Sequence, residues 1–280
     1  MNTAGIQSPA PVGVFDSGIG GLSILRALRA ELPHETFVYF ADSAHAPYGE
    51  RDDVYIAARS LAITAQLRQT HGIKALVVAC NTATAVAIAA VRTAHPDLPV
   101  VGVEPAIKPA VAHTRTGHIG VLATRGTVNS AKFNDLLITL APQARFTVTP
   151  CDGLAHAIET QNESKIRALI HLYTSATGNF GHENGAMDTL VLGCTHYPLE
   201  QAAFQAAVGP SIALVEPGHA VAKQLARVLE SLQSEVPPHP PSAPPRGSVC
   251  WLSSSANLSP LMRAVQRWLP QMAEQNPSQR

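Results

Sequence analysis

Short apolar segments of strand type alternate along this chain with longer segments in which apolar residues recur at helical spacing. The run VGVF at 12–15 precedes a leucine-rich helical segment, and KALVVAC at 74–80 precedes the Ala-rich run NTATAVAIAAV. Repeated strand–loop–helix units predict parallel sheets with helices on both faces. The 280 residues hold more such units than one compact sheet uses, so we predict an α/β fold with two domains.

Two of these units end in a cysteine. LVVACNTATA contains Cys80 and LVLGCTHYPL contains Cys194, 114 residues further on, which is about the length of one domain. This spacing predicts a pseudo-repeat, with one cysteine at the carboxyl end of a strand in each domain and the two thiols facing one substrate. Backbone N–H groups at a helix start favour the thiolate. Packing as a small apolar side chain is the alternative for each cysteine alone, and it is the preferred interpretation for Cys151 and Cys250.

Two facing thiols suit the inversion of a chiral Cα–H centre. A thiolate removes the proton from one face and the opposite thiol returns a proton to the other. The sequence has no defensible lysine motif for pyridoxal phosphate and no metal-ligand spacing, so we predict no cofactor and no metal. Asn81 and Thr82, with Thr195 and His196, are the expected hydrogen-bond donors around the substrate carboxylate, where they stabilise the carbanion. For His196 an ordinary core or surface histidine is the alternative. A zinc site formed by the two cysteines and His196 is a minor alternative.

Other polar turns follow the predicted strands. Ligands of open α/β sheets bind at the carboxyl ends of strands. DSGIGG places Asp16 and Ser17 at a helix start, where helix capping is the alternative to ligand binding. The turn is not G-x-G-x-x-G, which argues against a dinucleotide site. Pro47, Tyr48 and Gly49 form a second turn, for which an ordinary surface turn is the alternative, and Thr124 and Thr127 fall in a third.

The bulk composition excludes several classes of function. The formal net charge is zero and no Lys/Arg cluster occurs, so we expect no nucleic-acid partner. The N-terminus lacks the pattern of a signal peptide, and no apolar stretch has the length of a membrane helix. We therefore expect a cytoplasmic protein with reduced cysteines and no membrane partner.

Four motifs in order, GVFDSGIGGLSIL, YFADSAHAPYGER, VVACNTATA and LVLGCTHYPL, closely resemble the glutamate racemases of the aspartate/glutamate racemase superfamily. The resemblance covers roughly residues 11–232. It implies cofactor-free interconversion of L- and D-glutamate, which supplies D-glutamate for peptidoglycan. It also implies two flavodoxin-like domains related by pseudo-two-fold symmetry, with the active site between them. The first domain would comprise 11–100 plus 211–280, including the Pro-rich segment 236–245, and the second would comprise 101–210.

The resemblance also implies roles for single residues. Cys80 matches the base that acts on D-glutamate and Cys194 the base that acts on L-glutamate, while Asp16, His196 and Glu159 match residues that assist the thiols. The implied substrate contacts are Asp16, Ser17, Pro47, Tyr48, Gly49, Asn81, Thr82, Thr124, Thr127, Thr195 and His196.

Two other functions stay open at this point. One is racemisation of aspartate or another amino acid, and the other is glutamate binding by a non-catalytic regulator on the same scaffold. A homodimer is a further expectation for the assembly.

Overall fold

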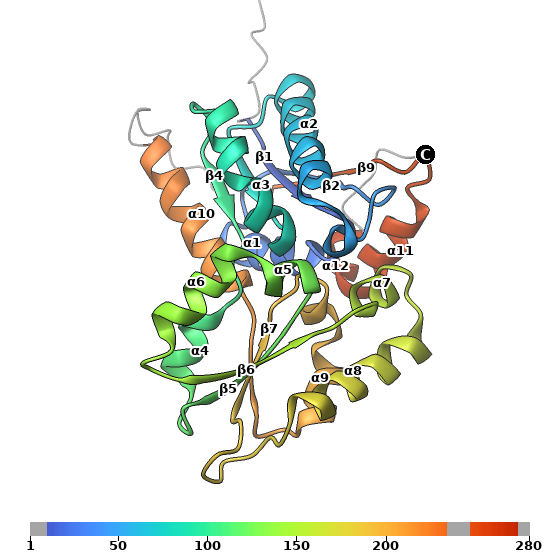
Figure 1. Ribbon diagram of the computed structural model, residues 1–280. Coiled ribbons are helices and arrows are strands. Elements are labelled where there is room, and N and C mark those ends of the chain that lie inside the picture. Colours follow the sequence, from blue (N-terminus) through green and yellow to red (C-terminus); the bar gives the residue numbers. More distant parts are fainter. Residues whose placement is uncertain (1–9, 234–246, 274–280) are drawn as a thin grey trace, which may run out of the picture.

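The computed structural model describes residues 10–233 and 247–273, which form two parallel sheets (Figure 1). The first sheet has five strands in the order β4-β3-β1-β2-β9, and the second has four in the order β6-β5-β7-β8. Within each sheet, the strand that comes first in the chain lies between the second and the third, which is the arrangement of flavodoxin-like sheets. The predicted α/β fold with two parallel sheets is confirmed.

The strands of the first sheet are β1 (Val12–Asp16), β2 (Phe37–Ala41), β3 (Ala75–Val78), β4 (Val100–Gly102) and β9 (Val249–Ser253). Those of the second sheet are β5 (His118–Ala123), β6 (Arg145–Pro150), β7 (Thr189–Leu192) and β8 (Ala213–Val215). The α-helices are α1 (Leu22–Glu31), α2 (Asp53–His71), α3 (Asn81–Ala94), α4 (Ile107–His113), α5 (Arg125–Asn129), α6 (Ala131–Leu140), α7 (Leu154–Glu159), α8 (Glu163–Thr177), α9 (Gln201–Val208), α10 (Gly218–Gln233), α11 (Ser259–Trp268) and α12 (Pro270–Ala273). Two 3-10 turns are η1 (Tyr48–Glu50) and η2 (Tyr197–Glu200).

Local sequence explains where the helices begin and end. The Asp52 carboxylate caps α2 by accepting a hydrogen bond from the Tyr55 N–H at 2.8 Å. The same helix ends at Gly72, whose φ of 57° lies in the left-handed region that glycine adopts without strain. In α1 the apolar spacing found in the sequence puts Leu22, Leu25 and Leu28 wholly inside the core.

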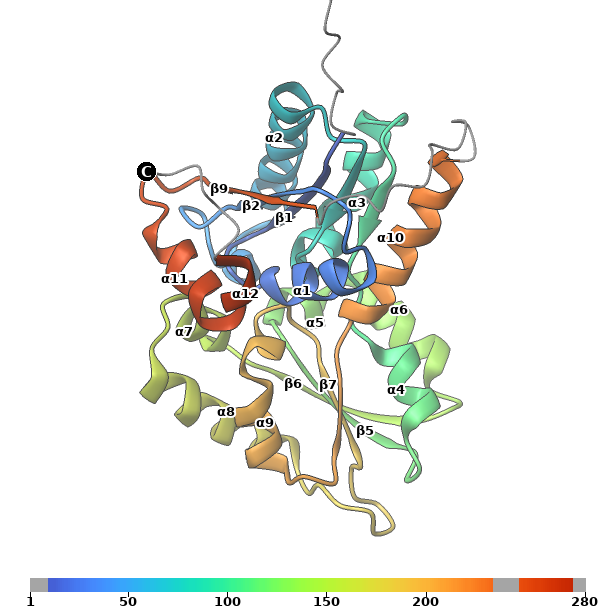
Figure 2. The same ribbon diagram turned by 180° about the vertical axis from the view of Figure 1, so that it is seen from behind.

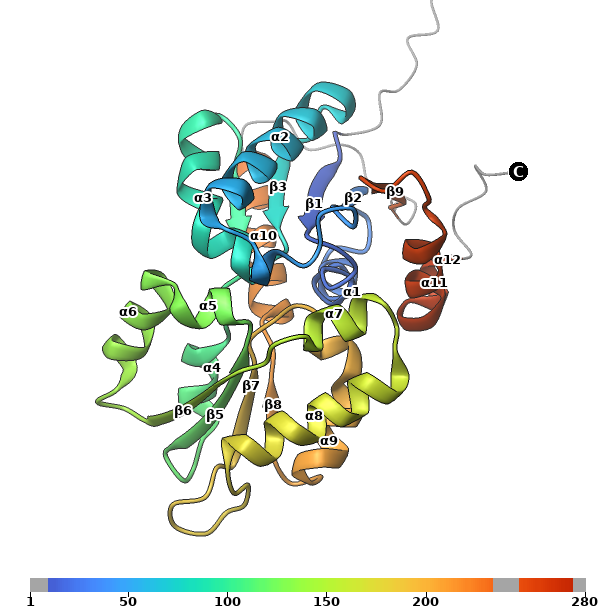
Figure 3. The ribbon, with the colours of Figure 1, turned by 45° about the vertical axis from the view of Figure 1, so that its right-hand side comes forward.

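Helices cover both faces of each sheet. Around the first sheet α2 packs against α3 on one face and α1 against α10 on the other (Figures 1 and 2). Around the second sheet α4 packs against α6, and α8 packs against α7 and α9 on the opposite face (Figure 3). One apolar core joins the two halves, since Leu22 and Leu25 of α1 share a cluster of buried side chains with Tyr197 and Phe204. This shared core fixes the relative position of the two sheets.

Over residues 10–233 and 247–273, the chain crosses between the halves twice, after β4 and after β8. The strand β8 pairs with β7 in the second sheet, although the sequence analysis assigns residues from 211 onward to the first domain. We therefore propose that the first domain ends after Gly102 and resumes after Val215. The last described strand, β9, pairs with β2, so the end of the described chain returns to the first sheet. The Pro-rich segment 236–245 lies outside the described residues.

Of the helices that the structure describes, none combines the length and the apolar character needed to cross a lipid bilayer.

Candidate active site

The ends of three strands carry the predicted catalytic residues. Asp16 is the last residue of β1, Cys80 follows β3, and Cys194 follows β7. Because β3 and β7 are the third strands of two sheets with the same strand order, the two cysteines occupy equivalent positions. Direct contacts between the loops after β1 and β7 bring the carboxyl ends of the two sheets together.

Cys80 lies at the start of α3, as its sequence predicts. Its side chain is 5% exposed, and its Sγ accepts a hydrogen bond from the Ala83 N–H at 3.5 Å. The Ser17 hydroxyl lies 3.9 Å from the same sulfur. Burial raises the pKa of Cys80 well above its ordinary value, and the nearby Asp16 carboxylate raises it further, against the lowering effect of the Ala83 N–H. The helix start therefore favours the thiolate of Cys80, as expected, but desolvation outweighs the backbone hydrogen bond and the pKa is raised.

Cys194 has a different neighbour. Its side chain is 6% exposed, and its Sγ lies 3.8 Å from His196 Nδ1. The first helical turn after it, η2, begins at Tyr197 with His196 as the N-cap, so Cys194 lies before the helix start and not at it. The expected helix-start environment is thus absent for this thiol, and a histidine takes its place.

Glu159 holds the far side of the His196 ring. Its Oε2 lies 2.8 Å from His196 Nε2, and the same oxygen accepts a hydrogen bond from the Ile19 N–H at 2.8 Å. Burial by itself lowers the pKa of His196, but the contacts with Cys194 and Glu159 outweigh it and raise that pKa well above the ordinary value. These two contacts therefore favour the protonated imidazole, which lies between a thiol and a carboxylate.

Asp16 joins the two halves at the centre of the site. Its Oδ1 accepts a hydrogen bond from the Thr195 hydroxyl at 3.3 Å, and its Oδ2 accepts one from the Gly18 N–H at 3.1 Å. The side chain is completely buried, and burial raises the pKa of Asp16 from 3.8 to about 6, against the opposing effect of His196. The N-cap of α1 is Gly21, so Asp16 is not the capping residue that the alternative interpretation required.

The glycines of DSGIGG have a function that sequence reasoning missed. A Cβ on Gly18 would lie 2.1 Å from Glu159 Oε2, and a Cβ on Gly20 would lie 2.3 Å from His196 Nδ1. Glycine is needed here because side chains from the other half approach the backbone of the turn. The signal was present as two glycines flanking Ile19, but their partners lie far away in the sequence.

The hydroxyls of Ser23 and Ser43 were missed as well. Ser23 Oγ donates a hydrogen bond to the Thr195 carbonyl at 2.7 Å, and Ser43 Oγ donates one to Glu159 at 3.5 Å.

Three predicted threonines form a row of hydroxyl groups between the halves. Thr82 Oγ1 lies 3.3 Å from Thr124 Oγ1, which in turn lies 3.0 Å from Thr127 Oγ1. Thr124 is the N-cap of α5, as its place at a strand-to-helix turn predicts. Gly49 faces this row, since a Cβ on it would lie 2.9 Å from Thr124 Cβ. The predicted substrate contacts of both halves therefore meet here.

The phenol of Tyr48 forms a hydrogen bond within the protein. Its hydroxyl donates to Asp42 Oδ2 at 2.5 Å, and Arg59 binds the same carboxylate at 2.6 Å. The turn of Pro47, Tyr48 and Gly49 is therefore anchored from behind. We expect its backbone, and not the phenol, to face a ligand.

Asn81 has a buried amide without a partner. Among the described residues, neither its Oδ1 nor its Nδ2 forms a hydrogen bond. A cavity of about 170 Å³ is lined by Asn81 and Thr127 together with apolar side chains such as Phe133 and Leu136. Buried amides are normally paired, so this one indicates a missing hydrogen-bonding partner at the site.

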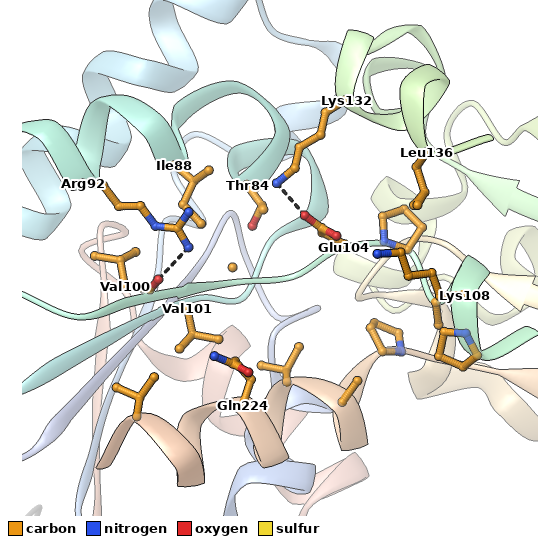
Figure 4. A pocket seen from close by; sticks show the side chains of 18 residues that line it. Thr84, Ile88, Arg92, Val100, Val101, Glu104, Lys108, Lys132, Leu136 and Gln224 are labelled. Carbon is orange, nitrogen blue, oxygen red and sulfur yellow. Dashed lines mark hydrogen bonds and ion pairs between the residues drawn. The ribbon is translucent and has the colours of Figure 1, made fainter. Parts of the chain in front are cut away.

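A larger cavity lies elsewhere between the halves (Figure 4). It measures about 400 Å³ and is lined by residues of both chain crossings, including Glu104 and Pro217. Lys132 pairs with Glu104 at 2.6 Å, and Arg92 donates to the Val100 carbonyl at 2.9 Å. None of the predicted catalytic or substrate-contacting residues lines it, so we do not assign the chemistry to this cavity. No group of three or more potential ligands suited to a metal ion occurs within 10–233 and 247–273.

Comparisons with known proteins agree with this geometry. The family model "Asp/Glu/Hydantoin racemase" matches residues 22–225. The chain is 50% identical over 225 residues to a glutamate racemase from Ectopseudomonas mendocina, a match that covers 80% of this chain and 83% of the relative. Its structure is similar to that of Escherichia coli glutamate racemase in complex with L-glutamate and the activator UDP-MurNAc-ala, with a TM-score of 0.76, 30% identity, and coverage of 93% and 96% of the two chains. It is also similar to the glutamate racemase of Francisella tularensis in complex with D-glutamate, with a TM-score of 0.73, 27% identity and 93% coverage of both chains.

Proposed function

The chain belongs to the glutamate racemases of the Asp/Glu/Hydantoin racemase family, and from this premise we propose how its residues interconvert L- and D-glutamate. The enzyme is an amino-acid racemase that does not depend on pyridoxal phosphate, and its function is linked to peptidoglycan synthesis. The proposal concerns the two thiols, the residues that assist them and the residues that hold the substrate.

The observation that carries the mechanism is the pair of buried thiols at equivalent strand ends, each with its own assisting residues. In the proposed reaction Cys194 as thiolate removes the Cα proton of L-glutamate, forming an S–H bond as the C–H bond breaks. The electron pair passes into the α-carboxyl group, and the Cys80 thiol then delivers its proton to the opposite face of Cα. In the reverse direction Cys80 acts on D-glutamate.

The environments of the two thiols match these roles in the free enzyme. His196 Nδ1 lies 3.8 Å from the Cys194 sulfur and Glu159 holds the other ring nitrogen, so His196 is proposed to assist proton transfer at Cys194. The raised pKa of Cys80 keeps that group protonated, as an acid must be. Asp16, whose pKa lies at about 6, is the group that we propose receives the Cys80 proton before D-glutamate reacts.

The substrate contacts fit an anionic intermediate. The unpaired amide of Asn81 and the hydroxyls of Thr82, Thr124 and Thr127 are proposed as donors to the substrate carboxylates, with Ser17 and Thr195 beside the thiols. Donors fixed in a buried site stabilise developing negative charge without reorganisation.

Circular dichroism of L-glutamate incubated with the purified enzyme tests the proposal. We expect the optical signal to decay to zero without added cofactor, and Cys80→Ser and Cys194→Ser each to prevent this decay. Cys250→Ser is the matched control, since this thiol is exposed on β9, and it should leave the rate unchanged. Full activity in both site variants would remove the two-thiol mechanism. Incorporation of solvent deuterium at Cα, compared between glutamate and aspartate, tests the choice of substrate.

Two further expectations stay predictions. A homodimer is measurable by analytical ultracentrifugation. The cytoplasmic location is measurable by fractionation of cells that produce the protein.

A further inference from the structure

Arg267 connects the two halves at the side of the active site. It lies on α11, which follows the first-sheet strand β9, and it forms ion pairs with Glu163 and Glu200 of the second half. The distance from Arg267 Nη2 to Glu200 Oε1 is 2.9 Å. Figures 2 and 3 both show α11 beside α7 and α8. One guanidinium thus holds two carboxylates from across the domain boundary.

Both carboxylates are closely connected to the active site by the chain. Glu163 lies four residues after Glu159, and Glu200 lies four residues after His196. The segment between Glu159 and Glu163 is a tight turn in which the Asn162 N–H donates to the Ala157 carbonyl at 2.9 Å.

The segment between His196 and Glu200 is the single helical turn η2, with the Leu199 N–H donating to the His196 carbonyl at 3.1 Å. Short hydrogen-bonded segments transmit a shift of one end to the other. Arg267 therefore binds one residue on each of the two short segments that hold Glu159 and His196. Each bound carboxylate lies four residues from the member of the pair that its segment holds.

The contact differs from an ordinary surface ion pair. Glu200 is only 11% exposed, whereas Glu163 is 48% exposed and Arg267 is 30% exposed. The guanidinium also lies over the Trp268 ring, 4.4 Å from its centroid, which limits the freedom of the arginine side chain. A planar guanidinium with fixed orientation can bind two carboxylates at once, which an ammonium group does less well.

We propose that Arg267 is a positioning residue for the racemisation reaction. From the first half it holds α8 and η2 so that Glu159 and His196 meet at hydrogen-bond distance beside Cys194. The inference rests on the proposed function, because the pair that it positions is the proposed partner of that thiol. The row of threonines that is proposed to bind the substrate lies on other elements, so loss of Arg267 should change the chemical step more than substrate binding.

Steady-state kinetics of arginine variants test the inference after wild-type racemisation has been measured. Arg267→Ala should lower kcat about tenfold, within the range that follows from a displacement of less than 1 Å at a reacting group, and should change KM less than about twofold. Arg267→Lys should recover part of the loss. The matched control is Arg68→Ala, which removes an arginine of similar exposure, 32%, that pairs with Asp97 away from the site, and which should leave kcat unchanged.

A second variant separates positioning from folding. Arg267→Ala leaves the nearly buried Glu200 carboxylate without its ion pair, which alone lowers stability. The variant Arg267→Ala with Glu200→Gln removes that unpaired charge. The double variant should regain thermal stability but keep the low kcat, because Arg267 no longer holds α8 and η2 in place.

Three outcomes overturn the inference. They are an unchanged kcat in Arg267→Ala, an equal loss in Arg68→Ala, and recovery of kcat together with stability in the double variant. In each of these the wild type remains active, so the proposed function stands. An inactive wild type would instead overturn the proposed function and, with it, the inference.

Discussion

Ionisation of the buried Asp16 carboxyl group should lower the free energy of unfolding at neutral pH. A variant with an uncharged side chain at this position should not show this loss. The Asp16 side chain is completely buried, and burial raises its pKa from 3.8 to about 6. In the unfolded chain the group ionises near its ordinary value. As the pH rises from about 4 to about 6, the unfolded chain therefore loses this proton before the folded protein does, and the folded state loses stability.

The size of the effect follows from the two pKa values. The interval between 3.8 and about 6, at 1.36 kcal/mol per pKa unit, corresponds to a loss of about 3 kcal/mol that is complete above pH ~7. Asp16→Asn cannot ionise and should not show this loss. The variant should therefore gain up to about 3 kcal/mol relative to the wild type between pH 4 and pH 7.5. Its racemase activity should fall, because Asp16 is the proposed partner of Cys80.

Urea unfolding at a series of pH values measures this difference. At each pH, the free energy of unfolding of the wild type is subtracted from that of Asp16→Asn. The change in this difference between pH 4 and pH 7.5 is the quantity to compare, because effects of the substitution that do not depend on pH cancel. A difference that does not change with pH would refute the reasoning. A variant that becomes relatively less stable as the pH rises would show that the hydrogen bonds to Asp16 and the charge of His196 outweigh burial.

Asp188 supplies a control of opposite sign. Burial favours its neutral form, but hydrogen bonds from the Thr114 hydroxyl and from the N–H groups of Arg115 and Thr116 lower its pKa to about 2. A carboxylate with a lowered pKa stabilises the folded state above its ordinary pKa and loses that contribution as the pH falls. Asp188→Asn should therefore be less stable than the wild type at pH 7.5, and the deficit should shrink toward pH 3.

Three other substitutions test hydrogen bonds and close contacts around the site. Gly20→Ala places a Cβ 2.3 Å from His196 Nδ1, so displacement of the imidazole should lower kcat about 100-fold, and an unchanged kcat would contradict the close approach. Tyr48→Phe removes the hydrogen bond to Asp42 and should lower the free energy of unfolding by about 2 kcal/mol in urea denaturation; a loss below ~0.5 kcal/mol would mean that Arg59 alone satisfies the carboxylate. Thr124→Val interrupts the row of hydroxyl groups and should raise KM for both enantiomers about fivefold in steady-state assays, whereas an effect on kcat alone would argue against substrate binding.

Local sequence signals were sufficient for the elements and for the placement of the thiols. The helices α2 (Asp53–His71) and α8 (Glu163–Thr177) show such signals at both ends. In both, a capping side chain marks the start and a glycine follows the last helical residue. Cys80 and Cys194 were found because an apolar run followed by a polar turn is a local pattern that each strand end repeats.

Contacts between the halves could not be derived from these patterns. Glu159 meets the N–H of Ile19 across 140 residues of chain, and nothing near either residue specifies the other. The raised pKa of Cys80 is not a local property either. The helix start favours the thiolate through the Ala83 N–H, but burial and the Asp16 carboxylate from another strand outweigh it and raise the pKa. A local pattern does not contain the burial that the whole fold imposes on a side chain.

The same strand order in both sheets explains why the site has two thiols, and the differences around them explain how one site serves both enantiomers. Enantiomers have equal free energies in solution, so the enzyme must accept each with comparable ease. In the proposed mechanism, the equivalent strand ends carry one thiol for each side of the substrate. The neighbours are unlike: an imidazole contacts Cys194, whereas a serine hydroxyl and a carboxylate lie near Cys80. In the proposed mechanism these unlike neighbours assist Cys194 as the base and Cys80 as the acid when L-glutamate reacts, while the equivalent strand ends give the two thiols opposite faces of Cα.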